Sequence, residues 1–336
     1  MNVEMLLRAP DLCPSLPVKI SPKIGQFSAN KGDLSLAVQA NSTLSNNEIV
    51  LSIPAELTIS VYSNLKPNQN LTWSSLLSLE LHKLKKQLST GVNDDTGKFH
   101  NLWLNSLPPA PLKTPFHFPE NLLKKLHYPH MEKRVQKQRL QWTKEYESIE
   151  PKLGLTYDEF VWGCEIARSR AFSSNFIPPF DFKPYAFTCV LVAFTVFGGY
   201  GSLEQAANGA AVVVCANLLK DFVIPKIAVS GKNEWGTKRY VIAPGIDLCQ
   251  HSNSPTAAVA FEYFSNTFSL STLSSDRSDG SSGGEDAGDG KFNPIEISYG
   301  ARSNDSLFQY YGFVLEENPH DVYVLPSVSF CVLRRG

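Results

Sequence analysis

The sequence lacks the features that mark several large classes of protein. Its 31 Lys and Arg residues are balanced by 32 Asp and Glu residues, so a net charge of −1 provides no basic field for nucleic acid. Its six cysteines are far apart, and no two of them have the C-x-x-C spacing of a tetrahedral zinc site. We therefore expect no direct nucleic-acid partner, no metal site and a reducing compartment.

Long uninterrupted apolar runs are also missing. Residues 185–203 carry no charge, but Gly198, Gly199 and Gly201 break this run, and the second run, residues 206–219, is short. A membrane-spanning helix needs about 20 predominantly apolar residues. The sequence therefore favours a buried pair of helices over a transmembrane span.

The composition is that of a chain that can bury a sizeable core. Of its 336 residues, 43% are hydrophobic and 19% are charged, which predicts one large domain with or without an appendage. Apolar segments at residues 34–40 and 49–54 predict two strands, the second ending at a proline. Residues 257–273 and 294–299 predict two more strands.

Residues 71–170 are predicted to be mostly helical, because their leucines recur on one helical stripe and charged residues follow. Thr156 and Glu159 have the spacing of a capping box, which predicts a helix that starts near Tyr157. By contrast, residues 274–290 are a Ser, Gly and Asp tract without apolar anchors. Such a composition predicts a flexible loop.

Three short motifs follow one another in the C-terminal part: D-L-C-Q-H-S at residues 247–252, I-S-Y-G-A-R-S-N at 297–304 and Y-Y-G-F-V at 310–314. Each alone is more often structural than catalytic. Their order, with E-N-P-x-D at 317–321, resembles SET-domain protein-lysine methyltransferases, and among them the branch typified by the Rubisco large-subunit methyltransferase.

This resemblance implies a mainly β fold (α+β) with a large helical insertion and a pseudoknotted active site. It also implies a division of the chain into an N-terminal extension, a SET domain and a remnant of a C-terminal substrate-binding domain: residues 1–17, 18–314 and 315–336. Within the SET domain we expect a helical insert, an extra apolar insert and the flexible loop, at about 71–170, about 183–228 and 274–290.

The implied activity is transfer of a methyl group from S-adenosylmethionine to a lysine side chain of a protein. The resemblance makes Tyr299 the catalytic residue, whose hydroxyl helps to orient the reacting centre. Ser303 and Asn304 are expected to shape the turn beneath Tyr299. Because Cys-rich zinc modules are absent, the resemblance favours a non-histone substrate, and we expect a monomer.

The resemblance also implies a set of cofactor-binding residues. Arg170, in the tetrapeptide S-R-A-F at residues 169–172, would hold the cofactor carboxylate, since guanidinium binds planar anions through paired donors. Its structural alternative is a charge that neutralises a helix C-terminus. Which of two adjacent tyrosines faces the site, Tyr310 or Tyr311, stays open, with Tyr311 preferred. The remaining members are Leu34, Leu36, Gln250, His251 and Phe313.

Two of these positions depart from the family pattern. Leu34 and Leu36 stand where relatives have a glycine-bearing strand that lets the backbone approach the cofactor. Gln250 stands where relatives have Asn. The alternative hypothesis is therefore a degenerate SET module that binds a partner without catalysis. We expect a cytoplasmic location, and the resemblance leaves the chloroplast stroma and the nucleus as alternatives.

Overall fold

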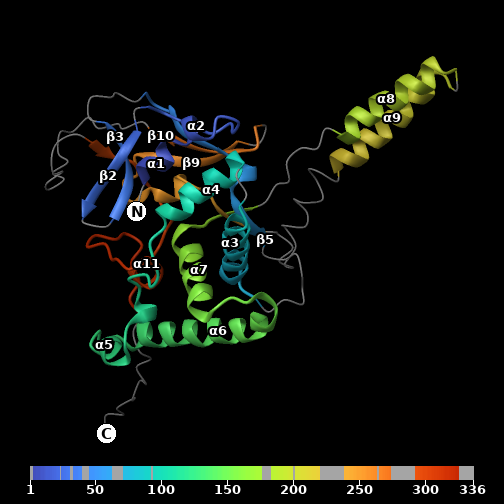
Figure 1. Cartoon of the computed structure of the whole chain (residues 1–336). Helices are drawn as coiled ribbons and strands as arrows, with labels where there is room; N and C mark the ends of the chain where they lie inside the picture. The colour runs from blue at the N-terminus through green and yellow to red at the C-terminus, as the bar shows by residue number, and fades with distance from the viewer. Residues whose placement is uncertain are drawn as a thin grey trace, which may run out of the picture.

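Helices and small sheets alternate along the chain in the computed structural model, which is shown in Figure 1. More residues lie in helices than in strands, so the protein is of the mixed α+β class. The prediction of a mainly β fold is wrong, because the long helices dominate while strands are two to seven residues long. The structure describes residues 3–22, 24–30, 33–39, 45–62, 71–91, 94–175, 183–199, 201–219, 238–262, 265–273 and 292–324.

Within these residues the strands form four small sheets. The largest has the order β1 (Lys19–Ile20), β4 (Ile49–Pro54), β10 (Thr267–Thr272) and β9 (Ala257–Glu262). Two further sheets have the orders β11 (Phe292–Pro294), β3 (Asp33–Gln39), β2 (Ile24–Asn30) and β5 (Ile59–Tyr62), β7 (Lys238–Ile242), β6 (Phe172–Asn175). The last pairs β12 (Glu296–Ile297) with β8 (Gln250–His251) in parallel, whereas the other pairs are antiparallel.

Two predicted strands are confirmed, because β3 and β4 occupy the apolar segments that indicated them. In β4, Val50, Leu51 and Ile53 are buried, which anchors the largest sheet in the core. The prediction of one strand over residues 257–273 is wrong. The chain reverses between β9 and β10, where Asn266 adopts a left-handed φ of 51° that asparagine tolerates.

The main helices are α3 (Trp73–Ser89), α4 (Asp95–Ser106), α6 (Pro129–Leu153), α7 (Tyr157–Arg170), α8 (Lys183–Phe197), α9 (Leu203–Leu218) and α11 (Asn304–Tyr311). Shorter ones are α1 (Val3–Leu7), α2 (Ala9–Leu12), α5 (Glu120–Lys124) and the 3-10 turns η1 (Ala55–Leu57), η2 (Pro115–His117) and η4 (Ile246–Leu248). The predicted helical region of residues 71–170 is confirmed.

Helix α7 links the sheets to the helical layer. Thr156 and Glu159 form the predicted capping box, in which the side chain of each residue accepts a hydrogen bond from the backbone amide of the other residue. Helix α7 packs along α3, where Gly163 lies so close to Ser78 that an added Cβ would fall 2.2 Å from the Ser78 hydroxyl oxygen. A glycine is needed there, and the close packing fixes the C-terminal end of α7 against the sheets.

The core lies between the sheets and the helices α1, α3, α4 and α7. Leu36, Leu51, Leu77 and Trp103 are among its fully buried side chains. A second cluster lies between α6 and α7 and includes the buried Trp142 of α6. In Figure 1, α6 runs across the end of the molecule opposite the sheets, and α7 connects the two.

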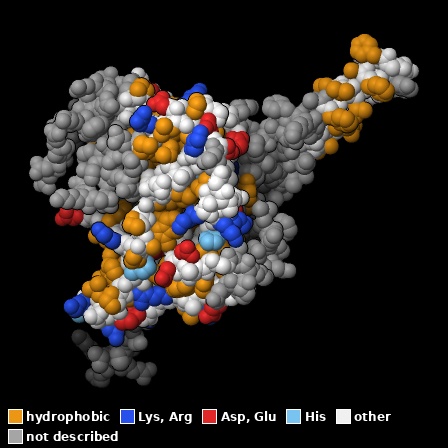
Figure 2. Space-filling model, viewed as in Figure 1, with side chains coloured by type: hydrophobic (Ala, Val, Ile, Leu, Met, Phe, Trp, Pro, Cys, Tyr) orange, Lys and Arg blue, Asp and Glu red, His pale blue; other side chains and the backbone are white. Residues whose placement is uncertain are grey.

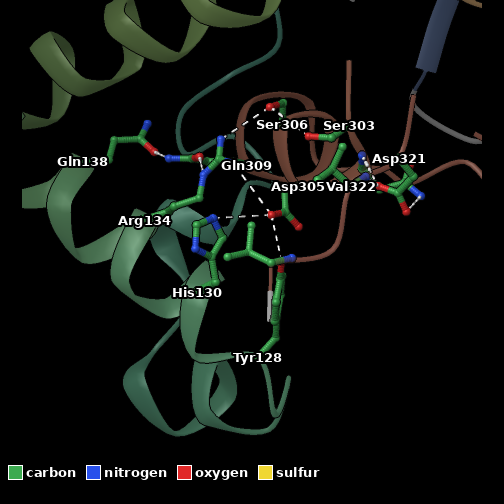
Figure 3. Close-up of polar contacts among 12 residues, drawn as sticks. Tyr128, His130, Arg134, Gln138, Ser303, Asp305, Ser306, Gln309, Asp321 and Val322 are labelled. Atoms are coloured by element: carbon green, nitrogen blue, oxygen red, sulfur yellow. Dashed lines mark hydrogen bonds and ion pairs between the residues drawn. The ribbon is translucent and has the colours of Figure 1, made fainter. Parts of the chain in front are cut away.

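Helix α11 is joined to α6 by a polar network, drawn in Figure 3. The Arg134 Nε donates to Gln309 Oε1 at 2.8 Å, and its Nη1 lies 3.8 Å from Asp305 Oδ2. Gln309 in turn donates to the buried Gln138 at 2.7 Å. These contacts hold the helix that carries the Y-Y-G-F motif.

Replacing Arg134 by Ala should therefore lower the free energy of unfolding by about 1 to 2 kcal/mol, since one charged donor to a largely buried network is lost. Urea unfolding of the purified chain measures this. The exposed Lys137 on the same helix is the matched control, and Lys137→Ala should change the free energy by less than about 0.5 kcal/mol. Equal losses in both variants would contradict the assigned role.

Helices α8 and α9 form the predicted helical pair, but the prediction that the pair is buried is wrong. Phe187, Phe194 and Val212 are 64%, 62% and 69% exposed. Figure 1 shows the pair extending away from the rest of the described chain. Among the described helices, none has the length and apolar character needed to cross a membrane.

Two predictions fall on residues outside the described ranges. These are the flexible loop at 274–290 and the second part of the apolar insert, 220–228. Of the predicted C-terminal remnant, residues 315–324 are described. There Tyr323 stacks on Tyr128 with ring centroids 4.5 Å apart, and the Val324 amide donates to the Tyr128 hydroxyl at 3.1 Å.

Candidate active site

A cavity of about 400 Å³ lies where the end of α7, the turn η4 and the segment after β12 meet. It gathers residues from the S-R-A-F, D-x-x-Q-H-S, S-Y-G and Y-Y-G-F motifs, which are far apart in the sequence. The lining side chains or backbones are those of Ser169, Arg170, Ala171, Phe172, Ser173, Asp247, Cys249, Ile297, Ser298, Tyr299, Gly300, Ala301, Arg302 and Tyr311.

A buried ion pair closes one wall of the cavity. Arg170 is the last residue of α7, and its Nη1 donates to Asp247 Oδ2 at 3.1 Å and to the Asp247 carbonyl at 3.0 Å. The side chain of Asp247 is fully buried, whereas that of Arg170 is 15% exposed. Among the described residues these contacts of Arg170 use Nη1 alone, so its Nε and Nη2 donors are available to a ligand in the cavity.

The Asp247 carboxylate has two further donors. Its carboxylate accepts from the Trp103 indole Nε1 at 3.1 Å and from the Gly245 amide at 2.8 Å. Burial raises the pKa of Asp247, and the Arg170 guanidinium opposes this shift. The pair is stable only if the carboxylate keeps all of its donors, because an unpaired charge at this depth is costly.

Tyr299 lines the same cavity. Its hydroxyl donates to the Cys249 carbonyl at 2.7 Å, and its ring stacks on Tyr311 with centroids 4.9 Å apart. Burial raises the pKa of Tyr299, so its hydroxyl stays neutral at physiological pH. A neutral, oriented phenol and a backbone carbonyl oxygen thus lie side by side at the cavity wall.

His251 contacts both the ring and the backbone of Tyr299. Its ring stacks on the Tyr299 ring at 5.0 Å, and its Nδ1 accepts from the Tyr299 amide at 3.1 Å. Burial lowers the pKa of His251, which favours the neutral imidazole that can accept this bond. Phe313 lies 6.3 Å from the His251 ring and 6.1 Å from the Tyr311 ring. His251 and Phe313 therefore form a second layer beneath the cavity wall.

The parallel pairing of β8 with β12 brings these groups together. His251 pairs with Ile297, and the Ser252 amide donates to the Ile297 carbonyl at 3.0 Å. This register places Tyr299 beside residues 249–251. Asn304 joins the start of α11 to the segment after this helix, since its amide side chain exchanges two hydrogen bonds with the backbone of Leu315.

Comparison of this sequence with protein-family models and with curated proteins gives no match. In the described part of the chain, His, Cys, Asp and Glu side chains form no group that could hold a metal ion.

Among the described side chains, four of the seven predicted cofactor-binding residues do not line the cavity: Leu36, Gln250, His251 and Phe313. Leu36 is fully buried in the main core, and its carbonyl accepts from the Ile295 amide at 2.9 Å. Leu34 lies on the same strand, where it pairs with Ser28. Gln250 is exposed on β8, where it pairs with Glu296. Of the predicted set, Arg170, Tyr299 and Tyr311 reach the cavity directly.

Sequence reasoning missed Trp103 and Arg168. Trp103 comes from the helical insert, and a buried Trp in an amphipathic helix gives no sign of a polar partner more than a hundred residues away. Arg168 lies between the rings of Trp73 and Tyr310, with its guanidinium carbon 4.6 Å and 4.9 Å from their centroids. Tyr310 is thereby engaged outside the cavity, which leaves Tyr311 as the inward residue.

Replacing Gln250 by Asn should leave the affinity for S-adenosylhomocysteine within about twofold, because the exposed side chain does not reach the cavity. Isothermal titration calorimetry of both proteins measures the difference. A gain of about tenfold, which corresponds to ~1.4 kcal/mol, would instead show that this position contacts the ligand.

Proposed function

We propose that this chain is an S-adenosylmethionine-dependent protein-lysine N-methyltransferase that acts on a non-histone protein. One observation carries the proposal. Arg170, Tyr299 and Tyr311, which occupy matching positions in three separate SET-like motifs, line one cavity together. Motifs that matched by chance would have no reason to converge on one cavity.

The cavity has the properties that the cofactor requires. Its volume of about 400 Å³ falls in the range of small-molecule sites. Arg170 offers donors for a carboxylate, while the Tyr299 and Tyr311 rings and the Cys249 carbonyl offer negative potential for a cationic sulfonium. These residues fit S-adenosylmethionine, which supplies an activated methyl group when bound.

The residues of the chain would then prepare a lysine amine to accept this group. A free lysine has a pKa of about 10.4, and only its neutral form can attack. Desolvation inside the cavity that Tyr299 and Tyr311 line disfavours the ammonium form. The neutral Tyr299 hydroxyl, fixed by the Cys249 carbonyl, orients the amine. Positioning of this kind supplies several kcal/mol without a strong base.

Charge near the cavity favours a substrate other than a basic tail. Arg302 lines the cavity and is exposed, with its Nε bound to the Tyr299 carbonyl at 3.1 Å. Asp247 is neutralised by Arg170. A segment rich in Lys and Arg would meet like charge at Arg302, whereas a target lysine flanked by acidic residues would meet opposite charge.

Incubation of the purified chain with methyl-labelled S-adenosylmethionine and cell or organelle extract tests the proposal. We expect a labelled protein band in which mass spectrometry locates a methylated lysine. The Tyr299→Phe variant is the control for contaminating activity. Absence of label with every extract, under conditions in which a known protein-lysine methyltransferase gives label, would contradict the proposal.

A second candidate function is a degenerate module that binds a partner without catalysis. Leu36 favours this candidate. It is fully buried in the core, at a strand position where SET-domain enzymes have a glycine that lets the backbone approach the cofactor. The two candidates differ in cofactor binding. A module without cofactor affinity would still capture a partner protein and would transfer no methyl group.

A further inference from the structure

A second cavity, of about 370 Å³, is lined by α7 and by residues 110–117, which include η2. Its α7 wall is one face of the helix, made by residues that recur at i, i+3, i+4 and i+7: Asp158, Val161, Trp162 and Glu165. The remaining lining residues are Ala110, Pro111, Phe116, His117 and Tyr157. None of these residues lines the candidate active site. We refer to this space as the α7–η2 cavity.

A buried carboxylate orients a histidine at this cavity. Glu165 is 3% exposed, and each of its oxygens accepts one hydrogen bond, Oε1 from the Thr114 hydroxyl at 2.5 Å and Oε2 from His117 Nε2 at 2.9 Å. Because a carboxylate only accepts hydrogen bonds, this contact places a proton on Nε2 of His117. In the neutral ring Nδ1 is then an acceptor, and it has no partner among the described residues.

The indole of Trp162 adds an aromatic wall. Its Nε1 donates to the Pro108 carbonyl at 2.9 Å, which fixes the ring. The Lys85 ammonium lies 4.7 Å from the ring centroid, and Lys85 lines a neighbouring cavity that Trp162 shares. Aromatic faces attract cations through the ring quadrupole, so this indole is a surface on which a cation is stable. Phe116 and Tyr157 add aromatic carbon to the α7–η2 cavity.

The charge of the cavity favours a cationic ligand. Asp158 is exposed in the first turn of α7 and makes no hydrogen bond or ion pair with another described residue. None of the described residues that line the cavity is Lys or Arg, so an anion would meet only like charge. Acidic and basic side chains are mixed over the helical part of the molecule (Figure 2), so the attraction is local to the cavity.

We propose that the α7–η2 cavity binds a small primary alkylammonium ion. The ammonium group would lie against the Trp162 indole, donate to His117 Nδ1 and pair with the Asp158 carboxylate, while its hydrocarbon chain contacts Val161 and Pro111. The volume of about 370 Å³ falls in the range of small-molecule sites. A metal ion fits less well, because His, Cys, Asp and Glu of the described chain form no group that could hold one. The inference is independent of the proposed methyl transfer.

Titration of the ¹⁵N-labelled full chain with n-butylammonium chloride at constant ionic strength tests this. The readout is the indole N–H resonance of Trp162, assigned by its absence in a Trp162→Phe variant. We expect a saturable shift with a Kd of about 1 mM or below. The neutral n-butanol and the quaternary butyltrimethylammonium ion, which cannot donate to His117, should each bind at least about tenfold more weakly.

A charge-removing variant tests the carboxylate. Asp158→Asn keeps the size of the side chain and should weaken n-butylammonium binding at least about threefold, the loss of one partly exposed ion pair. The matched control is Glu147→Gln, which removes an exposed carboxylate of α6 that does not line the cavity, and it should stay within about 1.5-fold. Circular dichroism of both variants checks that they fold.

Four outcomes would overturn the proposal. No saturable shift at tens of millimolar n-butylammonium would mean that the cavity does not bind the ion. Equal binding of n-butanol would show that apolar contact suffices, and equal binding of butyltrimethylammonium would show that no acceptor is used. Equal losses in the Asp158 and Glu147 variants would show that overall charge, and not the cavity, attracts the ion.

Discussion

Replacing Arg170 by Leu should lower the free energy of unfolding by about 3 to 5 kcal/mol at pH 7, because Asp247 would remain buried without its cationic partner. The loss should depend on pH. Without Arg170 the pKa of the buried Asp247 rises further above its unfolded value, and a raised carboxyl pKa destabilises the fold above that unfolded value. The cost should therefore be small near pH 4 and grow as the pH rises to 7.

Urea unfolding at several pH values measures this effect. The matched control is Arg302→Leu, which removes an exposed guanidinium from the same cavity and should cost less than about 1 kcal/mol. Adding Asp247→Asn to Arg170→Leu removes the buried charge and should recover part of the stability. A loss below about 1 kcal/mol at pH 7, or one that does not vary with pH, would contradict the buried pair.

Replacing Tyr299 by Phe should lower the methyl-transfer rate at least about a hundredfold and leave the affinity for S-adenosylhomocysteine within about twofold. The ring stays stacked between His251 and Tyr311, while the hydroxyl that we propose orients the amine is lost. Loss of its hydrogen bond to the Cys249 carbonyl should cost about 1 kcal/mol of stability.

The chain offers a close control for this variant. The Tyr146 hydroxyl also donates to a backbone carbonyl, that of Leu155, at 2.7 Å, but it lies in the cluster between α6 and α7. Tyr146→Phe should therefore leave turnover unchanged. If Tyr311→Phe slows turnover more than Tyr299→Phe does, the roles of the two tyrosines are reversed.

Local elements were predictable from the sequence because their signals are local. An apolar segment with a terminal proline indicated β4, and the spacing of Thr156 and Glu159 located the start of α7. The prediction of a mainly β fold was wrong, because it followed the family resemblance and not the number of residues in the predicted helices. The exposure of α8 was not predicted either. An apolar helix has the same sequence pattern whether it is buried in the core or exposed.

The motifs that form the site could be predicted from the sequence, but the residues that hydrogen-bond to them could not. Arg170, Tyr299 and Tyr311 lie in recognisable patterns and converge on one cavity. The binding of Trp103 and Arg170 to Asp247 depends on how α4 and α7 pack on η4, and no spacing in the sequence reports that. Leu36 and Gln250 were assigned by alignment to motif positions, whereas the register of β3 and β8 directs them elsewhere.

Calorimetric titration of the purified chain with S-adenosylhomocysteine tests the central claim most directly, because every proposed role depends on a cavity that binds this cofactor. We expect one site per chain with a micromolar Kd, together with a loss of at least about tenfold in an Arg170→Lys variant, whose single ammonium cannot form paired bonds to the carboxylate. No heat of binding at millimolar ligand would contradict the account and leave the partner-binding module as the function of this cavity.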